Sequence, residues 1–425
     1  MNYETFNMGA YNLHLINTKK FKSITIDISF RRKVVKEEIT IRNLLKLALL
    51  HSTANFKTER DLIIESENLY DLKLYSSIMR IGNDSILSFR TKFLNEKYTE
   101  KRMNEESIRF LLDVILNPNV TNKEFDNLII NKLKTKLEKE ITNLKDNKVK
   151  YSLFKLLSKV EDKPYSYNSY GYIDDLAKIN GKTLYDYYNS VIENDLIDVF
   201  IVGDLDNKEI KNIFREYFKV KTYHKPNIDV LVEELKPVSK IITNYEEDDV
   251  NQSQLTLLCS LNNLTEEERK YVLPVYNELL GGSSNSMLFE EVREKKSYAY
   301  YVRSVVNPYD NILMMYSGVE NGNEENATKV IKKVLVDAQK GRIPIDKLTN
   351  SKETIIANLK STCDYPNSII SHYFSKVLLN SVSIEEKIAK IDAVTLEDVI
   401  AVAKKVSLYS SFTLKGGNNN EENKD

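Results

Sequence analysis

The sequence predicts an α+β fold made of two homologous α+β domains. Three observations carry this prediction. The 425 residues are enough for two to three domains, strands group with strands and helices with helices, and part of the first half recurs in the second. A doubly wound parallel sheet would instead show strands and helices in regular alternation, so the pattern argues against that fold.

The recurrence is visible in two pairs of segments. LAKINGKTLYD at 176–186 matches IAKIDAVTLED at 388–398 at an offset of 212 residues, with Ala, Lys, Ile, Thr, Leu and Asp in register. Ahead of it, residues 129–134 match residues 355–360 at an offset of 226, sharing two isoleucines, a leucine and a lysine. Two matches in the same order indicate an internal duplication, with a shorter intervening segment in the second copy.

The expected elements follow a similar order in the two halves. Alternating apolar and polar residues predict strands, and apolar residues at helical spacing predict helices. The first half should contain strands at 23–30, 84–93 and 195–203, and helices at 41–58, 104–116 and 122–144. The second half should contain strands at 253–261, 298–306 and 311–319, a helix at 266–280 and then long helices.

These elements predict a first domain at 1–219 and a second at 241–415. The segment 220–240 between them has two prolines, many charges and no periodicity, which is typical of an interdomain linker. The last residues, 416–425, are polar and of low complexity, so we expect a disordered tail.

Composition and charge exclude several classes of protein. The chain is 42% hydrophobic and 29% charged with a net charge of −1, so neither nucleic acid nor a membrane surface is an expected partner. The sequence shows no signal peptide and no apolar run long enough to span a bilayer. Cys259 and Cys363 have no Cys-x-x-Cys spacing. We therefore expect a reduced, cytoplasmic protein.

The segment 281–304, GGSSNSMLFEEVREKKSYAYYVRS, carries the most specific functional signal. Gly281 and Gly282 open a polar turn, and this glycine pair either ends the preceding helix or forms a flexible lip beside a cavity. Arg293 follows in a short apolar-and-charged stretch, and Tyr300 lies seven residues later in an alternating, strand-forming run.

Arg293 and Tyr300 are candidates for holding a peptide. The planar guanidinium of Arg293 suits peptide carbonyls or carboxylates, and the hydroxyl of Tyr300 can donate to a developing oxyanion. In the alternative interpretation Arg293 forms a surface ion pair with Glu290 or Glu294, and Tyr300 is one of several core tyrosines.

This segment resembles the carboxyl-terminal half of the insulinase-like (pitrilysin-type, M16) zinc peptidases. In that family an Arg and a Tyr at this spacing hold the substrate peptide. The resemblance extends from Ser23 to about Leu414, and it implies two M16-like halves of the metallohydrolase type that enclose a cavity. It also implies a His-x-x-Glu-His zinc helix in the first half.

That zinc helix is degenerate in this sequence. Alignment on the residues that follow the motif puts Asn43 and Leu47 where the two histidines belong, and Lys46 where the general base belongs. The chain has four histidines, and no two of them lie within one helical turn. His51, next to this helix, is interpreted as a turn residue. Asp126, which falls near the position of the third ligand, is interpreted as a helix-surface carboxylate. We expect no metal site and no cofactor.

The loss of zinc has an energetic consequence. Zinc moves the pKa of its bound water from about 15.7 to about 7, which is on the order of 12 kcal/mol in hydroxide availability at about 1.36 kcal/mol per unit. An oxyanion donor contributes roughly 2.7–4 kcal/mol. Arg293 and Tyr300 cannot replace the missing ion, so the isolated chain should not hydrolyse peptides.

The resemblance therefore implies a non-catalytic, peptide-binding subunit. In paired M16 peptidases one subunit carries the metal, and the other supplies the Arg/Tyr pair. We expect a heterodimer with a zinc-bearing M16-type subunit, to which Arg293 and Tyr300 are supplied in trans, acting on an extended peptide or small protein substrate. More narrowly, the chain resembles the zinc-lacking member of bacterial insulinase-like pairs known as elongation factor P modification-associated proteins. The alternative is a scaffold or peptide-binding protein in a complex without proteolysis, like family members in the cytochrome bc1 complex.

Overall fold

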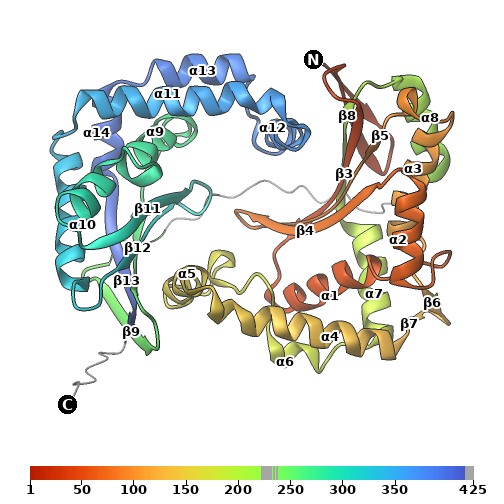
Figure 1. Ribbon diagram of the computed structural model, residues 1–425, viewed down its shortest axis with the longest axis horizontal. Coiled ribbons are helices and arrows are strands. Elements are labelled where there is room, and N and C mark those ends of the chain that lie inside the picture. Colours follow the sequence, from red (N-terminus) through yellow and green to blue (C-terminus); the bar gives the residue numbers. More distant parts are fainter. Residues whose placement is uncertain (222–231, 233–234, 236–237, 417–425) are drawn as a thin grey trace, which may run out of the picture. The chain divides into compact units, whose positions relative to one another are not determined.

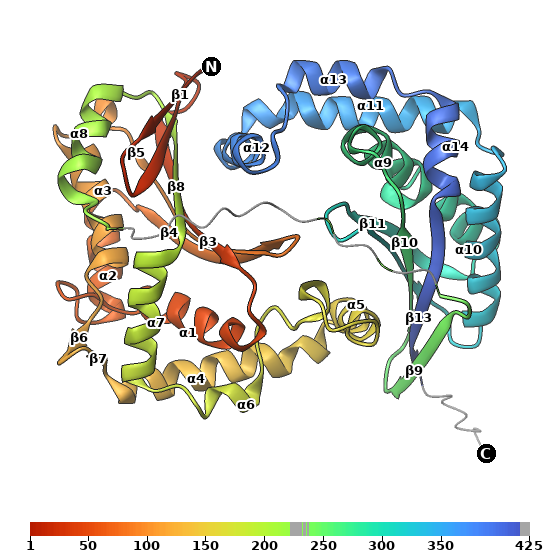
Figure 2. The same ribbon diagram turned by 180° about the vertical axis from the view of Figure 1, so that it is seen from behind.

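The structure, a computed structural model, describes residues 1–221, 232, 235 and 238–416, and these form two compact units (Figures 1 and 2). The first unit comprises Met1–Thr142, Asn168–Val230 and Thr362–Ser381, and the second comprises Asn143–Tyr167, Leu231–Ser361 and Val382–Asp425. Each unit combines helices with a mixed sheet, which confirms the predicted α+β class. The linker predicted at 220–240 and the tail predicted at 416–425 lie largely outside the described residues.

The first unit is built on a six-stranded sheet with the order β1-β2-β8-β3-β5-β4. Its strands are β1 (Asn2–Asn7), β2 (Tyr11–Asn17), β3 (Ser23–Lys33), β4 (Lys73–Ile81), β5 (Asp84–Leu94) and β8 (Leu196–Gly203). Its helices are α1 (Ile39–Leu49), α2 (Glu59–Asn68), α3 (Met103–Leu116), α4 (Asn127–Thr142), α6 (Ile173–Leu176), α7 (Gly181–Asn194), α8 (Asn207–Tyr217) and α12 (Pro366–Leu379). A small hairpin, β6 (Val120–Thr121) and β7 (Glu124–Phe125), precedes α4.

The second unit is built on a five-stranded sheet with the order β11-β12-β10-β13-β9. Its strands are β9 (Ile242–Asp248), β10 (Ser253–Leu261), β11 (Ala299–Asn307), β12 (Ile312–Val319) and β13 (Val406–Gly416). Its helices are α5 (Lys148–Ser158), α9 (Leu273–Asn277), α10 (Glu324–Gln339), α11 (Ile345–Ser361), α13 (Ile384–Asp392) and α14 (Leu396–Lys404). Three π-helical segments, η5 (Glu268–Val272), η6 (Glu278–Gly282) and η7 (Phe289–Glu294), complete it.

The two sheets share one topology. Read from β4, the first sheet pairs β4-β5-β3-β8 antiparallel and then adds β2 parallel to β8. Read from β11, the second sheet pairs β11-β12-β10-β13 antiparallel and then adds β9 parallel to β13. Only the first sheet carries a further strand, β1, beyond this shared set among the described residues. The shared order fits the duplication seen in the sequence.

Each sheet has two buried faces, and both are covered within its own unit. In the first, Ile24, Ile26 and Ile28 of β3 alternate toward a core shared with α1, α3 and α7, which explains the period of two in the sequence. In the second, Leu255 and Leu257 of β10 face a core shared with α9, α10 and α14. No helix among the described residues is long and apolar enough to cross a membrane.

The opposite face of each sheet is covered by a helix from the other half of the sequence. In the first unit, Tyr373 of α12 stacks on Tyr3 with ring centroids 4.4 Å apart, and Phe374 packs on Phe200 of β8. In the second, α5 packs on β10 and β13, and the Tyr151 hydroxyl donates to Glu246 at 2.7 Å. The compact units therefore differ from the domains predicted at 1–219 and 241–415 by this exchange of helices.

Two predicted helices differ from the observed elements. The helix predicted at 122–144 begins only at Asn127, because Asn122 and Lys123 have positive φ angles of 53° and 63° and form the turn between β6 and β7. The helix predicted at 41–58 ends at Leu49. After it, the Thr53 hydroxyl donates to buried Asp113 at 2.6 Å, which fixes an irregular loop.

Candidate functional site

Helix α1 contains the residues that align with the zinc motif. The first of them, Asn43, has a structural role. Its side chain is buried, and Nδ2 donates to the carbonyl oxygens of Ile39 at 3.0 Å and Ser169 at 2.9 Å. Its Oδ1 accepts from Nζ of Lys46 at 3.4 Å. The amide is therefore used to tie α1 to a neighbouring loop, and it is not free to ligate an ion.

Lys46 and Leu47 give the helix the wrong chemistry for a metal. Burial lowers the pKa of Lys46, with Glu140 opposing this shift and Lys136 adding to it. Leu47 packs against the core of the first unit. A zinc ion requires thiolate, imidazole or carboxylate donors, and no group of three such side chains could hold a metal anywhere in the described residues. The donor set at α1 does not fit zinc.

The two other residues weighed for this site also lie in structural positions. Asp126 is exposed at the start of α4, where Oδ1 accepts from the Leu128 N–H at 2.7 Å. His51 is half-buried in the turn after α1, with Nδ1 at 3.5 Å from the Ser52 hydroxyl. Sequence reasoning missed Lys132 and Lys136 of α4, which border the same pocket as Leu47 and His51. Their spacing of four residues on a predicted helix was the available signal.

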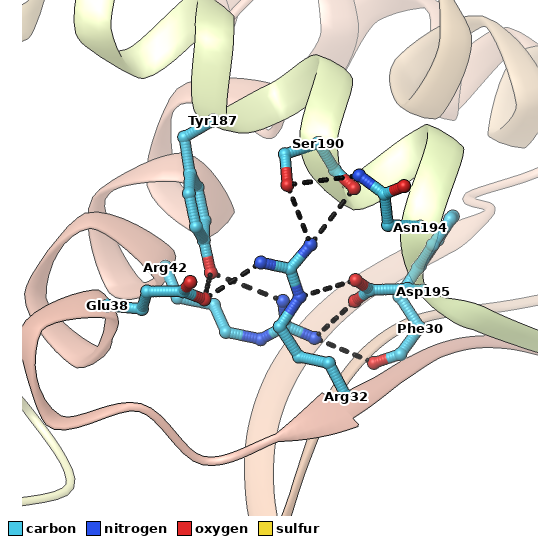
Figure 3. A network of polar contacts seen from close by, with 8 residues as sticks. All are labelled: Phe30, Arg32, Glu38, Arg42, Tyr187, Ser190, Asn194 and Asp195. Carbon is cyan, nitrogen blue, oxygen red and sulfur yellow. Dashed lines mark hydrogen bonds and ion pairs between the residues drawn. The ribbon is translucent and has the colours of Figure 1, made fainter. Parts of the chain in front are cut away.

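A buried ionic network fixes α1 against the sheet and α7 (Figure 3). Arg42, at 2% exposure, donates through Nη2 to Asp195 Oδ2 and to the Phe30 carbonyl, both at 2.8 Å. Arg32 donates through Nε to Asp195 Oδ1 at 2.5 Å and through Nη1 to Glu38 at 2.8 Å. Because Asp195 is fully buried and receives both guanidinium groups, this network is structural.

Tyr187 of α7 extends the network to the start of α1. Its hydroxyl donates to Glu38 Oε2 at 3.0 Å, and Nη1 of Arg42 lies 3.4 Å from the same hydroxyl. Burial raises the pKa of Tyr187 to about 12, so the phenol stays protonated and keeps donating. The orientation of α1 is therefore specified by residues other than those of the degenerate motif.

Arg293 lies on η7 and is exposed to solvent. Its guanidinium carbon is 4.7 Å from the ring centroid of Phe289 one turn earlier, a cation–π contact that orients the side chain. Glu290 is instead paired with Lys295 at 2.7 Å and with Lys347 at 2.6 Å. Arg293 makes no ion pair with any residue that the structure describes, so the surface-pair interpretation of this residue was wrong.

Tyr300 lies on β11 at a β-bulge. Ala299 pairs with Val319 and Tyr301 pairs with Gly318, so Tyr300 is the extra residue between them. Its side chain is 56% exposed, so it is not a core tyrosine. The neighbouring Tyr301 hydroxyl instead donates to Gln254. A bulge re-aims a side chain and ends regular pairing, and β11 is an edge strand of its sheet.

The backbone holds the segments of Arg293 and Tyr300 together. The Ser297 N–H donates to the Arg293 carbonyl at 3.0 Å, and the Tyr298 N–H donates to the Val292 carbonyl at 3.1 Å. Ser297 has a positive φ of 54°, which allows this tight reversal. The structure therefore places both predicted site residues, exposed, on one short hydrogen-bonded segment of the second unit, without a direct contact between their side chains.

Gly281 and Gly282 contact strand β11, which contains Tyr300. Gly281, the residue before the end of η6, lies against β11, and a methyl group at its Cα would lie 2.7 Å from the Ser304 nitrogen. The Gly282 carbonyl accepts from Arg303 Nη1 at 2.7 Å. These contacts support the structural interpretation, in which glycine permits a close approach of helix end and strand.

The fold and the site together define a class of protein: a duplicated α+β protein whose helix at the predicted metal position offers no metal ligands. Residues 178–355 match the family model described as Peptidase M16 inactive domain. The chain is 28% identical over 415 residues to Probable inactive metalloprotease YmfF of Bacillus subtilis (strain 168), and the match covers 96% of each protein.

Solved structures share the whole fold. A conserved protein from Enterococcus faecalis V583 matches with a TM-score of 0.89 at 24% identity, over 99% of this chain and 100% of that chain. The peptidase M16 inactive domain from Pseudomonas fluorescens matches with a TM-score of 0.78 at 16% identity, over 98% of each chain. The chain is thus homologous to an inactive M16 metalloprotease and contains a match to the M16 inactive domain, which confirms the resemblance carried by residues 281–304.

Proposed function

We propose that this chain is the non-catalytic, peptide-binding subunit of a heterodimeric M16-type zinc metallopeptidase. In this proposal a partner subunit supplies the zinc site, and Arg293 and Tyr300 contribute to peptide binding and oxyanion stabilisation in trans. The observation that carries it is the presentation of Tyr300, a 56% exposed tyrosine at a bulge of an edge strand. A large exposed aromatic side chain held on a rigid strand is a recognised feature of binding surfaces.

Edge strands offer a way to hold the extended substrate. β4 and β11 each end their sheet, so each has a row of backbone groups without a strand partner in the described structure. An extended peptide can add to such an edge through main-chain hydrogen bonds. On β4 the outward side chains Tyr75 and Met79 are 56% and 50% exposed, which provides apolar contact for a bound peptide.

The partner follows from the chemistry that the chain lacks. Asn43, Lys46 and Leu47 do not fit a metal, so the chain cannot generate a zinc-bound hydroxide. A subunit that binds peptide but has no metal is complementary to one that has the metal. The homology to an inactive M16 protein supports this arrangement.

Affinity purification from the native cell, followed by peptide-hydrolysis assays of the reconstituted pair, tests the proposal. We expect a zinc-bearing M16 subunit in the pull-down and zinc-dependent hydrolysis only by the pair. Tyr300→Phe should lower turnover by about 10²–10³-fold, because it removes one oxyanion donor. Tyr245→Phe is the matched control, since Tyr245 is also exposed but lies on β9, at the other edge of the same sheet.

Two results would contradict the proposal. Unchanged turnover in Tyr300→Phe would remove the oxyanion role from this residue. A pull-down without a zinc-bearing subunit would favour the alternative, a scaffold or peptide-binding protein in a complex without proteolysis.

A further inference from the structure

A pocket of about 500 Å³ lies within the first unit, between α1, α2, α4 and β4. Its apolar part is formed by Leu47 and Leu50 near the end of α1, Ile63 of α2, and Leu74 of β4. Lys73 and Tyr75 of β4 also line it, so the pocket opens beside an edge strand of the sheet. A peptide that adds to β4 would therefore pass this pocket.

One wall of the pocket is cationic. Lys132 and Lys136 lie one turn apart on α4, and neither makes an ion pair with any residue in the described part of the chain. Lys136 also acts on two further groups: its charge lowers the pKa of Lys46 and of His51, in each case after the larger effects of burial and of a glutamate that acts in the opposite direction, Glu140 and Glu59 respectively. Several positive groups thus repel one another here, and a bound anion would relieve that repulsion.

The opposite wall carries carboxylates, and they do not neutralise α4. Asp71 is paired with Lys73 at 2.5 Å. Glu59 and Glu67 line the pocket from the two ends of α2, and Glu59 raises the pKa of His51. No ion pair joins either glutamate to Lys132 or Lys136. The pocket is therefore divided by charge, with an apolar floor between its two walls.

We propose that this pocket binds a carboxylate of the substrate peptide against Lys132 and Lys136. The carboxylate belongs either to a Glu or Asp side chain or to the peptide's own carboxyl terminus. The inference rests on the proposed peptide-binding function and adds a specificity to it. The stems of two lysines and the leucines of the floor suit a side chain with an apolar stem and an anionic end. The pocket beside the degenerate zinc motif then binds no metal and instead gives the protein a preference for acidic peptides.

Fluorescence anisotropy with the full-length chain tests this specificity. The probe is a labelled, uncharged, C-terminally amidated peptide of nine residues, the length of β4. One set replaces each position in turn by Glu, a second by Gln and a third by Lys, and one further peptide keeps the neutral sequence with a free carboxyl terminus. At about 50 mM salt, where screening is weak, we expect about tenfold tighter binding of an acidic peptide, which equals about 1.4 kcal/mol.

Variants of α4 identify the source of the preference. Lys132→Met/Lys136→Met should lose the difference between Glu and Gln peptides, and Lys132→Glu/Lys136→Glu should turn it into a preference for Lys peptides. Lys101→Met/Lys139→Met removes the same charge from exposed positions outside the pocket and should keep the wild-type preference. Tighter binding in the Glu set assigns the site to an internal side chain, and tighter binding of the free-acid peptide alone assigns it to a carboxyl terminus.

The outcomes separate this inference from the proposed function. Binding of every peptide with equal affinity would overturn the inference and leave peptide binding intact. Equal loss of preference in the Lys101/Lys139 control would show a general charge effect and would also overturn it, as would a wild-type preference for Lys peptides. If no peptide binds at any concentration tested, the proposed function is overturned together with the inference.

Discussion

The two units place opposite charges at the same point of the same fold. The residue immediately before β8 in the first unit is Asp195, and the residue immediately before the equivalent strand β13 in the second is Lys405. Asp195 is fully buried and binds Arg32 and Arg42. Lys405 is 28% exposed and binds Glu268 at 2.7 Å. In both units this residue ties the start of an interior strand of the sheet, β8 or β13, to the helical segment that follows β3 or β10.

The different burial of Asp195 and Lys405 shows that two units with the same topology can depend on different interactions for their stability. In the first unit the tie is buried, with Asp195 fully inaccessible to solvent, and an uncompensated charge there is very costly. In the second, the helix region between Glu268 and Gly282 is held mainly by apolar side chains, including the fully buried Tyr276, Leu279 and Leu280. The ion pair there lies at the rim, where water screens it. Substitutions of equivalent residues should therefore have unequal effects.

The largest effect is expected for Asp195→Asn. The change keeps the shape of the side chain but removes the countercharge of the fully buried Arg42, and it leaves Arg32 with only its ion pair to Glu38. Loss of one partner of a buried ion pair typically costs about 3–5 kcal/mol, and we expect a loss of this size in the free energy of unfolding. Urea unfolding gives the global value. Hydrogen exchange followed by mass spectrometry should show faster exchange in β3 and α1 and little change in β10.

Lys405→Met is the control from the second unit, because it removes the corresponding side chain at the rim. We expect it to cost less than about 1 kcal/mol. Similar losses for Asp195→Asn and Lys405→Met would mean that burial does not separate the two ties, and the comparison would fail.

An intermediate effect is expected at the repeated segment, where the two units should behave alike. Helix α7 begins with a capping box between Asn180 and Thr183, and α14 begins with one between Thr395 and Asp398. Asn180→Ala and Thr395→Ala each remove a side-chain oxygen that accepts a backbone N–H, which costs about 1 kcal/mol. Thermal unfolding and hydrogen exchange at the two helix starts measure both losses.

Serine at either position restores the acceptor and serves as the control, so Asn180→Ser and Thr395→Ser should recover most of the stability. If Asn180→Ala and Thr395→Ala differ by several kcal/mol in the free energy of unfolding, the two caps are not equivalent. The two units would then be less alike in stability than the repeated sequence indicates.

Much of the fold could be predicted because buried residues recur in the sequence with the period of the strand or helix that contains them. The alternation in 23–30 predicted β3, and the runs at 253–261 and 311–319 predicted β10 and β12. The repeat also predicted equivalent helices, although its shared threonine is the third helical residue of α7 and the N-cap of α14. Exact starts depend on which nearby side chain caps the helix, and that choice is made by tertiary contacts.

The exchange of α5 and α12 could not be predicted. Each helix has an apolar face, but the pattern of apolar residues does not determine which of the two sheets that face covers. The candidate site shows the same limit. Spacing and resemblance identified Arg293 and Tyr300, whereas their exposure depends on a bulge and a π-helical turn that leave no period in the sequence. The cationic wall of Lys132 and Lys136 became visible only when α4 was placed beside α1.

The smallest effect is expected for Glu268→Gln, the partner of Lys405. Burial alone would raise the pKa of Glu268, but hydrogen bonds from Lys405 and from the Thr265 N–H hold it below its ordinary value. Because the folded-state pKa is the lower one, the carboxylate stabilises the fold fully above the unfolded-state pKa of about 4.3. This contribution is lost as the pH falls through the folded-state pKa.

At pH 7 we expect Glu268→Gln to cost about 0.5 kcal/mol, since the pair lies at the rim and glutamine can still accept the Thr265 hydrogen bond. The difference from wild type should shrink as the pH falls below the unfolded-state pKa of about 4.3 and then through the lower folded-state pKa of Glu268. Urea unfolding across this pH range measures it. A cost of several kcal/mol, or one that grows as the pH falls, would show that this rim pair is as strongly desolvated as the Arg42–Asp195 pair. The ties of Asp195 and Lys405 would then differ only in the sign of the charge before the strand, and not in their contribution to stability.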